Sequence, residues 1–169
     1  IQVVRCFDDP NTIHVSGRID PIDDIETINT ELALADIQTL ENRLKKITKS
    51  AKSGDKEAAL ENSVIEKLMP YLEQGSFINV KELFDEEKQK VLKHFFLLMT
   101  KPVIYCANVA EGDLKTGNEY VNKVKEYADK QGAQTVMICA GIEAELVSLG
   151  KEEAESYLKE LGVKTSGID

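Results

Sequence analysis

The chain has 169 residues, of which 42% are hydrophobic and 30% charged, and these proportions are typical of a folded domain rather than a disordered segment. Its formal net charge of -9 argues against a surface that attracts nucleic acid everywhere, because the overall field repels phosphate groups. Any contact with nucleic acid must therefore use a local basic patch.

Cysteine usage and hydropathy indicate the compartment. Cys6, Cys106 and Cys139 are widely spaced, and two of them lie in the apolar runs VIYCA and VMICA, where a thiol packs as a small hydrophobic group. No apolar run approaches the roughly 18 residues that span a bilayer, and the opening IQVVRCF lacks the features of a signal peptide. We therefore expect a soluble, cytoplasmic protein without membrane contact. Because a strand-like run begins at once without a Met, we also expect a piece of a longer protein.

The first half of the chain has the pattern of a strand followed by long helices. Residues 1–7 form a short apolar run that the loop sequence DDPN ends. From residue 23 to about 52, apolar residues recur every three or four positions, as on one stripe of a long helix. After the break SGD, a second stripe continues to near residue 75, which predicts an antiparallel helical hairpin. Pro70 predicts a kink or an early end of the second helix, and Asp85 predicts the start of a short helix ending near residue 96.

The second half changes to strands. The continuous apolar runs VIYCANV and TVMICAG flank an amphipathic helix at 117–131, an order that predicts a parallel βαβ unit buried on both faces. Residues 142–149 and 152–161 are expected to form closing helices. We therefore predict an α/β fold: residues 1–22 and 97–169 belong to a parallel sheet domain, and residues 23–96 form an inserted helical hairpin, or coiled coil.

The residues that follow the two later strands are the first candidates for a ligand site, because α/β sheets bind ligands at the carboxyl ends of their strands. These residues are NVAE at 108–111 and AGIE at 140–143. The amide of Asn108 and the carboxylate of Glu111 have the groups that recognise a purine edge. Taken alone, four such residues are more typical of an ordinary turn, in which Asn108 bonds its own backbone and Glu111 is solvated.

A resemblance favours the ligand site. The segment IDPIDDIETINTELALADIQTLE at 19–41, with VVRCF at 3–7 and NVAE at 108–111, is similar to the YchF subfamily of Obg-related P-loop NTPases. The resemblance implies part of a P-loop nucleotide-binding domain with a helical hairpin inserted into it. It also implies that the phosphate-binding loop and the Mg²⁺ ligands lie in parts absent from this chain, so that the chain alone would not hydrolyse nucleotide.

The resemblance implies binding and hydrolysis of ATP, and possibly of GTP, by the intact protein. Relatives in the superfamily carry Asn-Lys-x-Asp, whose Asp pairs with guanine, whereas Val109 and Glu111 stand at the Lys and Asp places here. A displaced carboxylate loses its advantage for guanine, while Asn108 can still meet the N6 amine and N7 of adenine. Ala140 and Gly141 stand where a second base-contacting loop lies, and an ordinary strand-to-helix turn explains Gly141 equally well.

His14 lies in the loop TIHVSGR, and the sequence offers two interpretations of it. It is either an ordinary loop histidine or, as the resemblance implies, the catalytic group that orients the attacking water where such proteins lack the usual glutamine. The two histidines of the chain are too far apart in sequence to suggest a metal site, and no other metal-ligand pattern occurs.

Cations gather around the expected tip of the hairpin in an otherwise acidic chain. They are Arg43, Lys45, Lys46, Lys49, Lys52 and Lys56. This cluster could meet the phosphates of RNA or of the ribosome, or it could be a solvated helix end whose cations favour the helix dipole. The alternative to the NTPase function is accordingly a non-catalytic module that binds the ribosome or a protein through this tip.

Overall fold

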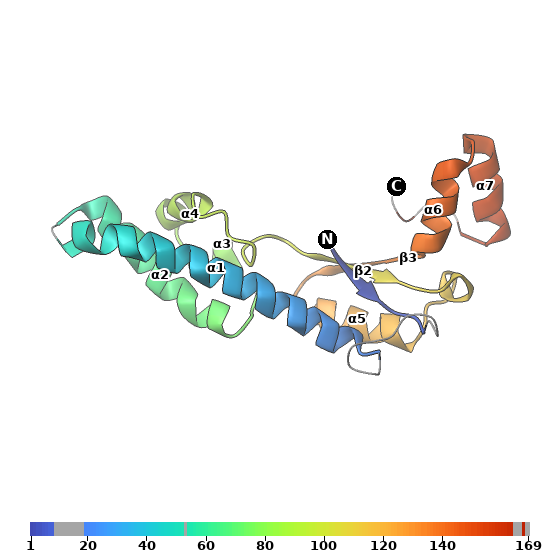
Figure 1. Cartoon of the computed structure of the whole chain (residues 1–169), viewed down its shortest axis with the longest axis horizontal. Helices are drawn as coiled ribbons and strands as arrows, with labels where there is room; N and C mark the ends of the chain where they lie inside the picture. Colours follow the sequence, from blue (N-terminus) through green and yellow to red (C-terminus); the bar gives the residue numbers. More distant parts are fainter. Residues whose placement is uncertain (9–18, 53, 164–166, 168–169) are drawn as a thin grey trace. The chain divides into compact units, whose positions relative to one another are not determined.

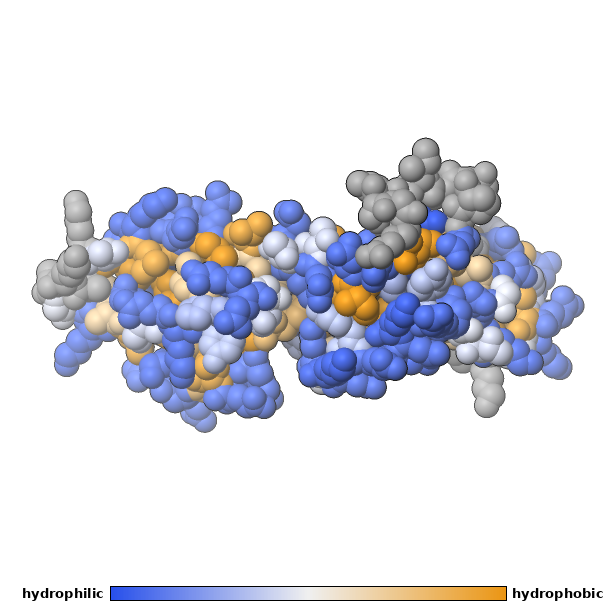
Figure 2. Space-filling model, turned by 90° about the horizontal axis from the view of Figure 1, so that it is seen from below, coloured by the Kyte–Doolittle hydropathy of each residue, from blue (hydrophilic) through white to orange (hydrophobic). Residues whose placement is uncertain are grey.

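The computed structural model describes residues 1–8, 19–52, 54–163 and 167 of the chain, except the side chains of residues 49–52. The chain divides into two compact units: an α/β unit, residues 1–25 and 103–169, and a hairpin unit, residues 26–102. The sequence pattern placed the hairpin at 23–96. No helix among the described residues is long and apolar enough to cross a membrane. Figure 2 shows a face on which hydrophilic side chains predominate, with smaller hydrophobic patches among them.

The α/β unit is built on a three-stranded parallel sheet in the order β1-β2-β3 (Figure 1). The strands are β1 (Gln2–Arg5), β2 (Ile104–Asn108) and β3 (Gln134–Ile138). The helices that follow are the short 3₁₀ helix η1 (Glu111–Asp113), α5 (Glu119–Lys130), α6 (Ala140–Ser148) and α7 (Lys151–Glu160). The predicted α/β class and the parallel βαβ unit are confirmed.

The two faces of this sheet differ. Val4 pairs with Ala107 and Ala107 with Met137, and this face packs against α5 in one apolar core. On the opposite face the edge strands leave Val3 and Val136 63% and 41% exposed. The prediction that the unit is buried on both faces is therefore wrong at these two edge positions, whereas Cys106 between them is 6% exposed.

The hairpin unit contains most of α1 (Pro21–Lys52), followed by α2 (Lys56–Glu73), α3 (Val80–Leu83) and α4 (Glu86–Lys93). Helices α1 and α2 lie side by side (Figure 1), as the predicted hairpin requires. Asp55 caps α2 by accepting the backbone N–H groups of Glu57 and Ala58. The hydrophobic core includes Leu40, Ile65, Leu68 and Leu72, which are at most 1% exposed.

Two local predictions in the hairpin unit need correction, and one helix was not predicted. Helix α2 continues past Pro70 to Glu73, so it does not end early there, because the buried stripe runs on through Leu72 and holds the last turn. Helix α3 was not predicted, since four residues are too few to show a period. Helix α4 ends at Lys93 rather than near residue 96, because Phe96 has a left-handed backbone, with φ of 54°.

Candidate functional site

The carboxyl ends of the three strands meet at one edge of the sheet. Arg5 is in register with Asn108, and Asn108 with Ile138, so the residues that follow each strand emerge together. Backbone bonds extend this alignment, because the N–H of Cys6 donates to the carbonyl of Asn108 and the N–H of Val109 to that of Ile138, both at 2.8 Å. The fold thus brings NVAE at 108–111 close to the start of α6.

Asn108 links the two segments directly. Its side-chain Oδ1 accepts the backbone N–H of Ala140 at 2.9 Å. Ala140 is the first residue of α6, whose N-cap Cys139 makes no side-chain capping bond, so Asn108 satisfies one of the unpaired donors at this helix start. Because the amide oxygen is engaged, its orientation is fixed and the NH₂ group is the part left to donate to a ligand.

The other members of the NVAE segment are placed differently from one another. The side chain of Val109 is 2% exposed and packs in the core of the α/β unit. Glu111 is exposed and opens η1, where the N–H of Leu114 donates to its carbonyl at 3.1 Å. The segment therefore holds one side chain inside and presents one carboxylate at the surface.

A residue that sequence reasoning missed braces this segment. Asn118 donates from Nδ2 to the carbonyl of Cys6 and to the carboxylate of Asp113, both at 2.7 Å. Its Oδ1 accepts the N–H of Val121 at 3.1 Å and so caps α5. One amide thus ties the end of β1, the loop after Glu111 and the start of α5. The only sequence signal was an Asn just before an amphipathic helix, which predicts a cap and not the other two bonds.

Ala140 and Gly141 are both exposed at the start of α6. A Cβ added to Gly141 would meet only the Sγ of Cys139, at 3.9 Å, so the fold itself does not require glycine there. Both residues are small, and Asn108 contacts the first of them through its side-chain oxygen. A flat ring could approach the backbone closely at this point.

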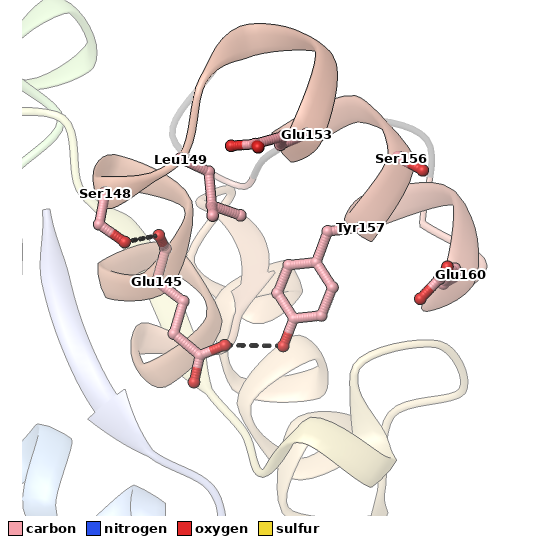
Figure 3. A pocket seen from close by; sticks show the side chains of 7 residues that line it. All are labelled: Glu145, Ser148, Leu149, Glu153, Ser156, Tyr157 and Glu160. Atoms are coloured by element: carbon pink, nitrogen blue, oxygen red, sulfur yellow. Dashed lines mark hydrogen bonds between the residues drawn. The ribbon is translucent and has the colours of Figure 1, made fainter.

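A separate cavity of about 610 Å³ lies between α6 and α7 (Figure 3). Tyr157 donates from its hydroxyl to Oε2 of Glu145 at 2.7 Å, and this bond is the largest of the causes that raise the pKa of Tyr157 to about 12. The residues that line the cavity are Glu145, Ser148, Leu149, Glu153, Ser156, Tyr157 and Glu160. Three carboxylates without a Lys or Arg among these described residues would repel phosphate, so the cavity does not suit a triphosphate.

The predicted catalytic residue His14 lies outside the described residues. Among those described, no group of three or more His, Cys, Asp or Glu side chains could hold a metal ion. None of them is therefore assigned to Mg²⁺, which the resemblance places on other parts of the protein. The thiol of Cys6 is buried beside β2, and burial raises its pKa to about 12, so it is a poor nucleophile.

The basic residues of the hairpin are not equivalent. Arg43 donates from Nε and Nη2 to the two oxygens of Glu61, both at 2.6 Å, and so joins α1 to α2. Lys45, Lys46 and Lys56 are exposed. The side chains of Lys49 and Lys52 lie outside the described part of the structure. At least one member of the predicted cluster thus has a structural bond as well as a charge.

The sequence was compared with models of protein families and with curated proteins. No family model matches it. It is 46% identical over 170 residues to the Ribosome-binding ATPase YchF of Bacillus subtilis, and 43% identical over 168 residues to that of Escherichia coli O157:H7; each alignment covers 99% of this chain and 46% of the relative.

A comparison with solved structures finds the same group of proteins. The YchF GTPase of Schizosaccharomyces pombe matches with a TM-score of 0.80 and 32% identity over 97% of this chain and 46% of that one. The chain thus spans a little under half the length of the curated relatives and the structure it matches. On these similarities, it belongs to the YchF subfamily of Obg-related P-loop NTPases.

Proposed function

We propose that the protein containing this chain binds and hydrolyses a purine nucleoside triphosphate, ATP in preference to GTP, and associates with the ribosome. The names of the relatives, Ribosome-binding ATPase and YchF GTPase, support the class of function. The observation in this chain that carries the proposal is the bond from the N–H of Ala140 to Asn108 at the carboxyl edge of the sheet. It fixes an amide at the carboxyl ends of the strands, where α/β proteins bind ligands.

The fixed amide suits adenine. The NH₂ group of Asn108 can donate to N7, and its oxygen keeps a second lone pair that can accept from the N6 amine. Guanine carries a carbonyl oxygen instead of that amine, which the second N–H of Asn108 can meet, so the preference for adenine rests on Glu111. Glu111 stands where relatives in the superfamily place the Asp that accepts from guanine, and its longer side chain displaces the carboxylate.

The remaining residues of the site have supporting roles. The side chain of Val109 is buried in the core, so it anchors the segment there and does not contact the base. Ala140 and Gly141 let the ring lie close to the backbone. Glu111 is exposed at the rim, where its charge disfavours a misplaced phosphate.

Hydrolysis would need groups beyond these. Bound Mg²⁺ would neutralise charge on the β- and γ-phosphates, and the phosphate loop would hold them. In the intact protein we assign His14 to orient the attacking water, because an imidazole can accept a proton from it. We place this activity in the cytoplasm, in keeping with three buried cysteines that are all free.

For the ribosome we propose the basic part of the hairpin unit as the contact. Lys45, Lys46 and Lys56 are exposed there and can meet phosphates. Residues 26–102 contain 12 Lys and Arg against 13 Asp and Glu, whereas the rest of the chain contains 9 against 17. The charges of -1 and -8 make the hairpin unit the less repulsive part toward RNA.

The test is calorimetry of ATP and GTP binding to the intact protein with Mg²⁺ present. Asn108→Asp keeps the oxygen that accepts from Ala140 but replaces the NH₂ donor with a negative oxygen. We expect it to weaken ATP binding by about tenfold or more, because a hydrogen bond to the base is lost and an acceptor faces N7. Asn122→Asp, at an exposed position of α5, makes the same change of charge and should leave binding unchanged. Absence of nucleotide binding by the wild type would leave the non-catalytic binding module.

A further inference from the structure

A second cavity, of about 380 Å³, lies in the hairpin unit between α1 and the end of α4. Its lining residues are Thr39, Asn42, Arg43, Lys46, His94 and Phe95. Two of these described residues are cationic, three offer an imidazole, an amide or a hydroxyl group, and none is a carboxylate. This composition suits an anion with hydrogen-bonding neighbours.

Hydrogen bonds to Asp36 fix the chain that follows the groove residues His94 and Phe95. Asp36 is 3% exposed, and its two oxygens accept the backbone N–H groups of Leu98 and Met99, both at 2.8 Å. These bonds hold the chain that leaves α4 against α1. Glu61 of α2 holds Arg43 with two hydrogen bonds, which occupy two of the five donors of the guanidinium.

Phe96, directly after the groove residue Phe95, has two unfavourable features at once. Its side chain is 80% exposed, although Phe95 and Leu97 on either side are buried. Its φ is 54°, in the left-handed region that a glycine or asparagine adopts at lower cost. An aromatic side chain displayed by a strained turn on a braced support points to a contact outside the chain.

We propose that this groove and Phe96 bind single-stranded RNA, with a phosphate against Lys46 and His94 and an unpaired base stacked on Phe96. The proposal rests on the ribosome association proposed above and names the chemical class of the contact. RNA fits better than an acidic protein segment, because cationic side chains in the groove can meet phosphates and an exposed aromatic ring in the adjoining turn can stack on an unpaired base.

Fluorescence anisotropy of the 169-residue chain with a labelled single-stranded RNA of about twelve nucleotides tests the proposal. Phe96→Leu keeps an apolar side chain but removes the aromatic face, and we expect affinity to fall about fivefold or more, whereas Phe96→Tyr should stay close to the wild type. Tyr71→Ala removes another partly exposed aromatic residue of the same unit and should have no effect.

The salt dependence of RNA affinity distinguishes a phosphate contact at Lys46 from an effect of the overall charge of the protein. Lys46→Gln should weaken binding and lower the slope of log affinity against log salt by about one, because one counterion fewer is released. Lys81→Gln, an exposed lysine on α3, makes the same change of charge away from the groove and should leave the slope near the wild-type value. A duplex RNA of equal length should bind more weakly, since it offers no unpaired base.

The proposal is overturned if Phe96→Leu and Lys46→Gln bind the RNA as the wild type does, or if the wild type does not bind it. Cosedimentation of the intact protein with ribosomes separates the two proposals. If the intact protein associates with ribosomes but the groove variants bind RNA as the wild type does, the groove proposal is wrong and the proposed function stands. If RNA binding by the variants falls as expected but the intact protein does not associate with ribosomes, the groove proposal stands and the proposed ribosome association is wrong.

Discussion

The hairpin unit encloses its own hydrophobic core, whereas the α/β unit leaves part of its sheet open. Leu40, Ile65 and Leu68 of the hairpin unit are fully buried by helices of the same unit. In the α/β unit one face of the sheet is covered by α5, but Val3 and Val136 on the other face remain exposed. Parallel sheets are normally covered on both faces. The hairpin unit therefore buries its apolar side chains with its own helices, whereas the sheet of the α/β unit does not have this cover at Val3 and Val136.

The largest effect expected from this comparison is on core packing. Leu68→Ala removes a fully buried side chain from the hairpin core and should lower the free energy of unfolding of the hairpin unit by about 3 kcal/mol. Val136→Ala, on the open face of β3, should cost less than about 1 kcal/mol, because little buried area is lost. Denaturant unfolding followed by circular dichroism measures both. Equal losses would contradict the comparison.

A smaller effect is expected at Asp36, whose hydrogen bonds hold the chain after α4 against α1. Asp36→Ala leaves the N–H groups of Leu98 and Met99 without their acceptor and should cost about 2 kcal/mol. Asp36→Asn keeps one acceptor oxygen and should cost less. The measurement is again chemical denaturation, and an Asp36→Ala variant as stable as the wild type would show that the bonds contribute nothing.

The smallest stability effect is expected at Asn118. Asn118→Asp keeps the oxygen that caps α5 but loses the donors to Cys6 and Asp113, and it sets a carboxylate against that of Asp113. We expect about 1 kcal/mol of destabilisation and a several-fold weaker binding of ATP by the intact protein, because the segment after Glu111 is no longer held. Unchanged ATP affinity despite the lost stability would confine Asn118 to a structural role.

Sequence periodicity predicted most of the helices and the parallel strands, because the apolar stripe of α1 and the continuous runs of β2 and β3 are long enough to show their pattern. It could not predict that Asn108 would meet Ala140, since they are 32 residues apart and only the strand register joins them. The same is true of Asp36 and Met99, which are 63 residues apart. A left-handed backbone at Phe96 carries no sequence signal at all, because phenylalanine is not a residue that favours it.

Some expectations remain predictions. His14 and the side chains of Lys49 and Lys52 lie outside the described residues, so their roles depend on experiments with the intact protein. The residues predicted to contact the base meet at one edge of the sheet, and their role in binding stays a prediction. The hairpin groove was not visible in the sequence, because its residues come from α1 and the end of α4.

The most direct measurement is hydrogen–deuterium exchange of the intact protein with and without ATP. The account predicts slower exchange in the backbone of residues 108–114 and 139–142, where the base would lie, and no change at the core of α2. If ATP binds without altering exchange in either of the first two segments, the assignment of this sheet edge to the base is contradicted.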